Sequence, residues 1–207
     1  LTALDTLVQL LPRKRKDEQF MDSFQTLMQK EIHRLTKLTE TFLDFSKSAL
    51  ENRGEVDLRR VIERVVQLLG PLFTTKKVQL MVDTTLSPLL EGDEHQLESL
   101  VMNLLQNAFR SVGNGGIVEI STGFLKKAGS GQGPWIVLQV KDNGEGIPKE
   151  NLSKIFNPFF TTRGEGTGLG LAICQKIVEH HRGRLEVKSV PKRETVFRVL
   201  FPTLTGP

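Results

Sequence analysis

The sequence is poor in cysteine and has no long hydrophobic run, and both absences narrow what the chain can be. The single cysteine among 207 residues, Cys174, excludes an internal disulfide bond and a metal site built from several cysteines. Its apolar helical surroundings predict a buried structural thiol. No apolar run approaches the ~18 residues that a membrane-spanning helix needs, and no signal peptide is recognisable. We therefore expect no membrane segment in this chain and a cytoplasmic location, with any membrane anchor in a longer parent protein.

Charge of one sign is also scarce, which argues against nucleic acid as a partner. The 28 Lys and Arg residues against 24 Asp and Glu residues give a net charge of only +4. No segment interleaves basic and aromatic side chains as nucleic-acid-binding segments do. This mild basicity suits smaller anionic ligands such as nucleotides. A hydrophobic content of 38% supplies enough apolar material for a folded core, which excludes intrinsic disorder.

The first 53 residues carry helical periodicity throughout. Apolar residues at three- and four-residue steps predict a first helix that ends at Pro12. They are Leu1, Leu4, Val8 and Leu11. A heptad-like stripe predicts a second helix of roughly 30 residues. Its members are Phe20, Phe24, Leu27, Leu35, Leu38, Phe42, Phe45 and Ala49. The antiparallel hairpin so formed favours dimerisation into a four-helix bundle, with packing against the chain's own second domain as the alternative.

From residue 54 onward, helix and strand patterns alternate, which predicts a second domain over residues 54–207. Helices are predicted over residues 58–73, ending near Gly70-Pro71, over 94–112 with Asp93 as N-cap, and over 168–181. Strands are predicted over residues 78–82, 116–125, 135–142, 184–190 and 195–201. This order indicates an α+β fold, in which helices cover one face of a mixed sheet as a two-layer α/β sandwich.

A carboxylate and a glycine turn form the first candidate site segment. Asp142 ends a predicted strand, and Gly144 and Gly146 let the backbone turn sharply after it. A carboxylate sheltered from water accepts well from a donor such as the exocyclic amine of adenine, and Ile147 would supply an apolar face for the base. An Asp-Asn-Gly turn is also common in ordinary β-loops, so this segment predicts a nucleotide site only together with the two segments described next.

Two amides lie one helical turn apart, at Asn103 and Asn107, on one face of a largely apolar predicted helix. Because buried amides without partners are costly, the pair indicates a ligand more than the surface or capping role of a lone asparagine. The amide oxygen of Asn107 can coordinate Mg²⁺, which prefers hard oxygen ligands. Arg110, on the same helix, is close enough to meet phosphate oxygens.

The third segment, residues 164–170, is rich in glycine but lacks the Lys-Ser/Thr ending and the preceding strand of a P-loop. It predicts a lid that leads into a helix N-terminus, where free backbone amides and the helix dipole favour phosphate. The residues assigned to phosphate here are Thr161, Thr162, Arg163, Gly166, Thr167, Gly168, Leu169 and Gly170. Residues 156–160 predict either an apolar hinge for this lid or ordinary core packing.

In their order and spacing, these segments resemble the ATP-binding half of sensor histidine kinases. The helix around Asn107 resembles the N box, and residues 142–147, 156–160 and 164–171 resemble the first glycine box, the F box and the second glycine box. Thr195 lies in a segment that resembles the last strand motif, where a threonine helps to hold adenine through water, although Glu194 replaces the usual glycine. The resemblance spans residues 55–202 and implies the Bergerat fold, with ATP or ADP and Mg²⁺ as ligands.

The predicted hairpin resembles the dimerisation and phosphoacceptor segment of the same kinases. Residues 31–46 resemble its second helix, and residues 1–4 resemble the positions just after the box that holds the acceptor histidine. The resemblance therefore implies that the acceptor is missing here. Surface or capping roles are predicted for the four histidines, which are His33, His95, His180 and His181.

The implied function is the catalytic core of a histidine kinase, which transfers the ATP γ-phosphate to a histidine for relay to an aspartate of a response-regulator receiver domain. We expect this chain to bind Mg-ATP, to form a homodimer, and to phosphorylate a longer partner chain but not itself. One alternative is a gyrase-type ATPase, which Asn103 disfavours because it stands where those enzymes have a glutamate general base. The other is a non-catalytic module whose helical pair is gated by nucleotide.

Overall fold

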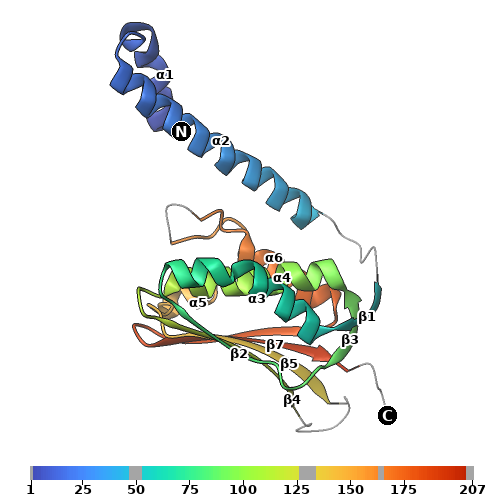
Figure 1. The fold of residues 1–207 in the computed structure, drawn as a ribbon. Helices are drawn as coiled ribbons and strands as arrows, with labels where there is room; N and C mark the ends of the chain where they lie inside the picture. Colours follow the sequence, from blue (N-terminus) through green and yellow to red (C-terminus); the bar gives the residue numbers. More distant parts are fainter. Residues whose placement is uncertain (1, 47–52, 126–133, 163–165, 204–207) are drawn as a thin grey trace. The chain divides into compact units, whose positions relative to one another are not determined.

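The computed structural model describes residues 2–46, 53–125, 134–162 and 166–203. The chain divides into two compact units, residues 1–46 and residues 47–207. The first unit holds two helices, α1 (Thr2–Lys14) and α2 (Glu18–Ser46) (Figure 1). Asp17 starts α2, because its carboxylate accepts from the Phe20 amide at 3.0 Å. At 29 residues, α2 has the predicted length, while the predicted stripe member Ala49 lies outside the described residues.

The prediction that Pro12 ends the first helix is wrong, since α1 continues to Lys14. Proline removes one amide donor and clashes with the carbonyl four residues earlier, which matters most in a helix interior. Pro12 stands in the last turn of α1, so only two residues after it must keep the helical conformation. The basic residues that follow are exposed in the turn to α2.

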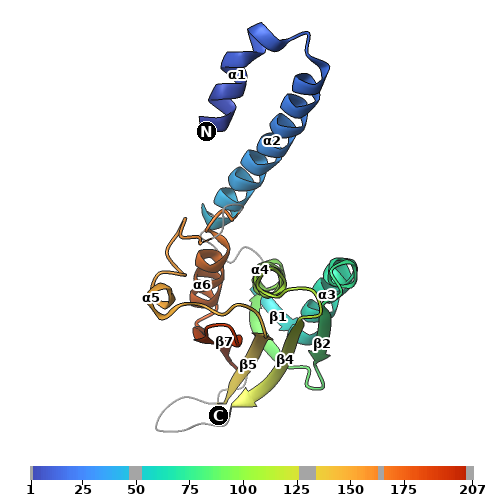
Figure 2. The ribbon, with the colours of Figure 1, turned by 90° about the vertical axis from the view of Figure 1, so that its left-hand side faces the viewer.

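A five-stranded mixed sheet organises the second unit. Its order is β2 (Gln79–Asp83), β4 (Ile117–Leu125), β5 (Trp135–Asp142), β7 (Glu194–Pro202) and β6 (Arg184–Val190). β2 runs parallel to β4, and the other neighbours are antiparallel. The longer helices α3 (Leu58–Thr75), α4 (Glu94–Ser111) and α6 (Gly170–His180) cover one face, and α5 (Lys149–Leu152) is a single short turn (Figures 1 and 2). The predicted two-layer sandwich is confirmed.

The central strand β5 shows why one side of the sheet is the core. Ile136, Leu138 and Val140 are almost fully buried, whereas the residues between them are only half-buried. This alternation is what a strand with one covered face produces. Asp142 continues the same inward series at the end of β5 and is also buried. The strand period therefore carries a carboxylate into the space beneath the helices.

The helix α3 continues through Gly70-Pro71 to Thr75, so the predicted end near those residues is wrong. Phe73 explains the extension, because its side chain is buried and its ring centroid lies 4.9 Å from that of Phe109 on α4. The hydroxyls of Thr74 and Thr75 donate to the Gly70 and Pro71 carbonyls. Tertiary packing here outweighs the low helix propensity of glycine and proline.

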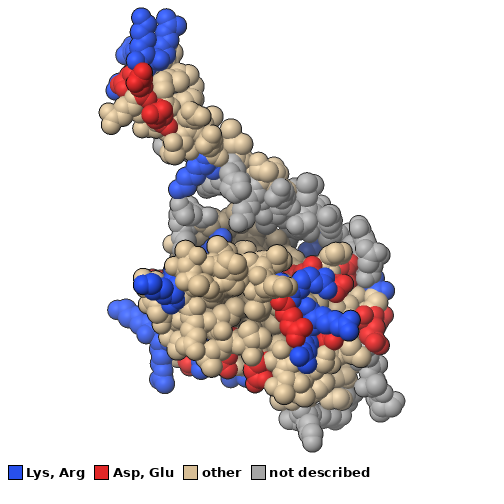
Figure 3. All heavy atoms as spheres, viewed as in Figure 1, with Lys and Arg blue, Asp and Glu red and all other residues tan. Residues whose placement is uncertain are grey.

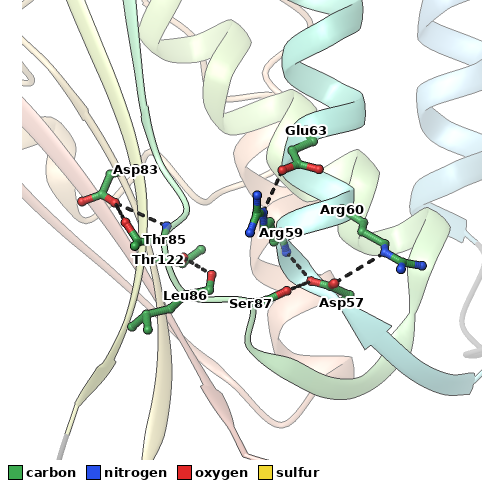
Figure 4. Close-up of polar contacts among 9 residues, drawn as sticks. All are labelled: Asp57, Arg59, Arg60, Glu63, Asp83, Thr85, Leu86, Ser87 and Thr122. Atoms are coloured by element: carbon green, nitrogen blue, oxygen red, sulfur yellow. Dashed lines mark hydrogen bonds and ion pairs between the residues drawn. The ribbon is translucent and has the colours of Figure 1, made fainter.

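A second, two-stranded sheet was not predicted. β1 (Arg53–Asp57) pairs antiparallel with β3 (Leu89–Asp93). Figure 4 shows how the loop between β2 and β3 is held: the Ser87 hydroxyl donates to Asp57 at 2.7 Å, and the Thr122 hydroxyl donates to the Leu86 carbonyl at 3.0 Å. Asp57 also caps α3 by accepting from the Arg59 amide. One aspartate thus joins β1, α3 and the loop before β3.

Charged side chains gather at the N-terminal end of α3, where Arg64 pairs with Glu94 and Glu98 of α4, and the remaining visible surface of that helix is largely uncharged (Figure 3). Such exposed pairs contribute little to stability. Among the described residues, no helix combines the length and apolar character needed to cross a membrane. Cys174, on α6, is fully buried as predicted.

Candidate functional site

Asp142 is the centre of the candidate site. Only 3% of its surface is exposed, and one carboxylate oxygen accepts from the Ser111 hydroxyl at 2.6 Å and from the Gly144 amide at 2.9 Å. The Ser111 hydroxyl also lies 2.7 Å from the Ala108 carbonyl, and its single proton serves one of these acceptors at a time. Ser111 is the last residue of α4. The carboxylate is therefore fixed between a strand end, a helix end and a turn.

Gly144 is required where the turn meets α4. A Cβ atom at this position would lie 2.4 Å from the Ser111 carbonyl oxygen, far inside van der Waals contact. The Glu145 amide donates to that same carbonyl at 3.2 Å. Gly146 approaches the Val190 carbonyl at the end of β6 in a similar way. The turn after Asp142 thus connects the end of α4 with the β6–β7 turn.

Thr195 lies directly opposite Asp142 in the pairing of β5 with β7 and is also buried. Its hydroxyl is 3.0 Å from the Ser189 hydroxyl, which accepts from the Ile147 amide at 2.8 Å. The structure therefore brings Asp142, Ile147 and Thr195 together through Ser189, which was not predicted. The Glu194 carboxylate lies 3.5 Å from the Lys141 ammonium group, so the glutamate is accommodated beside the sheet.

The two predicted amides of α4 have different surroundings. The Asn103 amide nitrogen donates to the Ser99 carbonyl at 2.8 Å, and its oxygen faces Gly170, where a Cβ atom would lie 2.8 Å away. The Asn107 amide nitrogen is buried and has no hydrogen-bond partner within the part of the chain that the structure describes. A buried polar group without a partner costs free energy that a ligand can recover. Arg110, in the last turn of α4, is exposed.

The predicted phosphate segment is brought to α4 only at its end. Leu169 is the N-cap of α6, is buried, and makes no side-chain capping bond. Gly168 has a φ of +68° and lies against the Phe159 backbone. Gly166 and Thr167 are half-buried, whereas Thr161 and Thr162 are exposed. Arg163 lies outside the described residues.

The segment predicted as a hinge or as core does not pack as a unit. Phe159 is 63% exposed and has a φ of +67°, so core packing is wrong for this residue. Phe156 and Phe160 are half-buried, and the preceding Ile155 is buried. An exposed aromatic side chain on a backbone of left-handed conformation is unusual.

Of the two roles predicted for the histidines, His181 has the capping role. It is the C-cap of α6, and with only 2% of its surface exposed it is not a surface residue. His95 is exposed and His180 half-buried. The side chain of His33 lies outside the described part of the chain.

The site fits a nucleotide better than a metal cluster. Over the described ranges, no group of three His, Cys, Asp or Glu side chains could hold a metal ion. Within the described structure, the Asn107 amide nitrogen has no partner and no side chain caps the N-terminus of α6, so both retain N–H groups that could donate to an anionic ligand.

Comparison with known proteins agrees with this geometry. Residues 92–205 match the family of histidine kinase-, DNA gyrase B-, and HSP90-like ATPases. Sensor histidine kinase ZraS of Salmonella typhimurium (strain LT2) is 31% identical over 180 residues, which are 86% of this chain and 37% of ZraS. The chain thus spans little more than a third of that curated relative.

Solved structures agree with the fold. The catalytic domain of histidine kinase ThkA superposes with a TM-score of 0.64 at 28% identity, covering 73% of this chain and 96% of that one. ThkA in complex with the response regulator protein TrrA gives a TM-score of 0.75 at 24% identity, covering 96% of this chain and 57% of that one. With more than half of its residues matched by the family, this chain belongs to the histidine kinase-, DNA gyrase B- and HSP90-like ATPases and carries their nucleotide-binding fold.

Proposed function

We propose that this chain is the ATP-binding catalytic core of a two-component sensor histidine kinase. Residues 1–53 act as the dimerisation hairpin and residues 54–207 bind ATP. The observation that carries the proposal is the Asn107 amide nitrogen, which is buried without a partner in the described structure and lies one turn from Asn103 on α4. The similarity to ZraS, a sensor histidine kinase, supports the choice of the kinase branch of the family.

The predicted residues around the adenine and at the start of α6 have these roles in the proposal. Asp142 accepts from the exocyclic amine of adenine, while the Ser111 hydroxyl and the Gly144 amide hold its carboxylate in place. Ile147 packs on the base and Thr195 holds its edge. The backbone amides from Gly168 to Gly170, at the start of α6, bind phosphate oxygens.

Asn107 would hold Mg²⁺ by its amide oxygen. The ion supplies charge neutralisation for the phosphate groups, and Arg110 adds a positive charge near them. The protein itself then contributes positioning, so that the γ-phosphate faces the imidazole of an acceptor histidine in line. Little covalent chemistry is required of these residues.

Asn103 favours phosphotransfer to protein over hydrolysis. An amide cannot accept a proton from water, and the Asn103 nitrogen is already occupied by the Ser99 carbonyl. A gyrase-type ATPase needs a general base at this position. A water molecule here would therefore not be activated by this side chain.

The hairpin supports a dimeric kinase. Val8, Ile32 and Leu35 are all more than half exposed in a single chain, which leaves apolar side chains for a second copy to cover. We propose that the response-regulator receiver domain is the phosphoryl acceptor downstream, since ThkA was solved in complex with a response regulator protein. A cytoplasmic location follows from that partnership.

Phosphotransfer across chains tests the proposal. This chain would be incubated with radiolabelled Mg-ATP alone and with a chain extended upstream through the acceptor box, in which Asn107→Ala and Asp142→Ala disable the pocket. Acid-labile label should appear on the extended chain only in the mixture. ATP binding without label would favour a nucleotide-gated module, and label released as inorganic phosphate would favour an ATPase.

A further inference from the structure

Three contacts show how α4 and its N-cap Asp93 lie along α6 and its C-cap His181. The Asn103 amide faces Gly170, the Cys174 sulfur lies 4.0 Å from the Leu100 carbonyl, and His181 reaches Asp93. Because the α4 partners descend in number as the α6 partners ascend, the helices run in opposite directions along this contact. Asn103 and Gly170 form the end that belongs to the proposed nucleotide site. His181 and Asp93 form the other end.

The His181 ring is held on every side. Its Nε2 atom lies 3.0 Å from the Asp93 backbone nitrogen, and its Nδ1 atom lies 2.7 Å from the Ile177 carbonyl oxygen. An amide N–H only donates and a carbonyl only accepts, so the ring is neutral with its proton on Nδ1. Phe201 packs against the ring at 5.9 Å between centroids. A Cβ atom at Gly92 would lie 2.5 Å from the ring, so this glycine is what admits it.

Asp93 passes this constraint to the start of α4. Its backbone amide donates to His181, while its carboxylate caps α4 by accepting from the His95 and Gln96 amides. A shift of Asp93 therefore shifts the first turn of the helix that carries Asn103 and Asn107. The hydrogen bond from the Asp93 amide to His181 thus joins that first turn to the C-terminus of α6.

We propose that His181 is a positioning residue of the nucleotide site, which sets the placement of α4 relative to α6 from the end opposite to the ligand. The inference rests on the proposed function, because it assigns Asn107 and the α6 N-terminus to one nucleotide. At 1.5 Å per residue, Asn103 lies about 15 Å along α4 from Asp93. A tilt of about 4° at the His181 end would move the other end by about 1 Å, and misplacement of that size can cost about 100-fold in rate.

The surroundings of His181 make this placement sensitive to acid. Burial lowers the pKa of the imidazole, and the charged or titratable groups around it are Asp93 on β3, His180 next to it and Arg53 on β1. Asp93 favours the protonated ring, whereas His180 and Arg53 oppose it. Protonation would place a hydrogen on Nε2 that faces the Asp93 N–H, so Nε2 could no longer accept and the hydrogen bond between Asp93 and His181 would be lost.

A matched pair of amide variants separates positioning from folding. His181→Gln places an amide oxygen near the Nε2 position and can still accept from Asp93, whereas His181→Asn places a donor near Nδ1 and keeps only the bond to Ile177 within α6. Mg-ATP dissociation constants of the full chain would be measured between about pH 5.5 and 8, the range in which histidine titrates. Denaturant unfolding in the same buffers gives the folded fraction of each variant.

We expect His181→Asn to weaken Mg-ATP binding about tenfold at pH 8, and His181→Gln to stay within about threefold of the parent, the scale of a typical coupling between sites. The parent's affinity should fall below about pH 6.5, and His181→Gln should lose that dependence. Equal affinities for the two variants, or losses that only track the unfolded fraction, would overturn the proposal. Failure of the parent chain itself to bind Mg-ATP would instead refute the nucleotide site.

Discussion

At the scale of single residues, the site is built around a carboxylate that is almost completely removed from water. A buried charge is costly unless hydrogen bonds compensate it. Asp142 has two such bonds from separate elements, Ser111 on α4 and Gly144 in the turn. This arrangement fixes its orientation before any ligand arrives, so the binding free energy is not reduced by ordering the side chain.

The exchange Asp142→Asn tests the role given to this carboxylate. The amide keeps the shape but presents either a weaker acceptor or a donor to the exocyclic amine of adenine, so we expect ATP affinity to fall about 100-fold. Isothermal titration with Mg-ATP measures the change. Asp83→Asn is the matched control, because Asp83 also ends a strand but is exposed and bonds only locally to Thr85. Equal effects of the two exchanges would contradict the assignment.

Ser111 deserves a separate test because its role depends on a contact 31 residues along the chain. A hydrogen bond to a charged group contributes about 1.5–3 kcal/mol, so Ser111→Ala should weaken ATP binding, by about 150-fold at most. The same titration applies, with the exposed Ser153→Ala as control. An unchanged affinity for Ser111→Ala would show that the Ser111 hydroxyl is not needed to orient Asp142.

Sequence patterns predicted Asp142, Asn103 and Asn107 as candidate site residues, because each stands in a local motif of helix or turn. They did not locate Ser111, Ser189 or His181. Those residues acquire their roles from partners that are distant in sequence, such as Asp93, which is 88 residues from His181. A serine or a histidine at the end of a helix has no neighbouring sequence pattern that would reveal such a partner.

At the scale of elements, the start of α6 is the most constrained turn of the site. Gly168 combines a φ of +68° with backbone contact to Phe159, where a Cβ atom would lie 2.4 Å from the carbonyl carbon. L-residues in such a conformation carry about 1–3 kcal/mol of strain. The sequence predicted a helix entry here, and the structure adds that the preceding loop is packed against it.

Gly168→Ala should therefore displace the α6 N-terminus. We expect at least a tenfold loss of ATP affinity, together with a loss of unfolding free energy of about 1–3 kcal/mol. Titration and urea unfolding measure the two quantities. The control is Gly113→Ala, where an added Cβ atom meets no atom within 4 Å and φ is not positive. If Gly168→Ala bound ATP normally, the turn would have to relax without moving α6.

The sequence did not predict β1, β3 or the last turn of α3, because tertiary packing rather than local pattern forms them. β1 and β3 are each five residues long and contain Gly and acidic residues, so neither shows the β-branched alternation that marks a strand. Their pairing comes from the tertiary fold. For α3, the pattern Gly70-Pro71 indicated an end, and burial of Phe73 against Phe109 carried the helix onward.

Acid should destabilise the second unit through His181. Because burial lowers the pKa of this imidazole in the folded state, the unfolded chain binds its proton at the higher pH. The contribution of neutral His181 to the free energy of unfolding is therefore fully present above the ordinary histidine pKa of about 6.5. It decreases as the pH falls from there through the lower pKa of the folded state. Urea unfolding at several pH values measures it, and His181→Gln should flatten that part of the curve. A parent curve no steeper than that of His181→Gln would contradict this linkage.

At the scale of the whole molecule, the chain consists of two compact units, and we assign nucleotide binding to one and self-association to the other. The unit of residues 47–207 contains the sheet, its three long covering helices and the described site residues. The unit of residues 1–46 contributes two helices with exposed apolar side chains. Nucleotide binding and self-association should therefore be separable by deletion.

A chain of residues 47–207 should bind Mg-ATP with an affinity within about threefold of the whole chain, because its core is its own. It should also be a monomer, whereas we expect the whole chain to be a dimer. Sedimentation equilibrium gives the oligomeric state. Ile32→Asp together with Leu35→Asp offers the control within the full chain, since charge on the exposed seam should produce the monomer without any deletion. A dimeric fragment would place the contact in the second unit.

The burial of Cys174 has a practical consequence for all of these measurements. It is the chain's only thiol, and burial raises its pKa far above the usual range, so the folded protein presents no reactive thiolate to an alkylating reagent. An alkylating reagent can therefore reach Cys174 only when the contact between α4 and α6 opens, so the rate of alkylation reports how often that contact opens. If bound nucleotide holds the two helices together, it should lower this rate. Because Cys174 stays unlabelled in the folded protein, cysteines introduced on the surface of each unit could be labelled selectively. Distances between the two units could then be measured from these labels without first replacing Cys174.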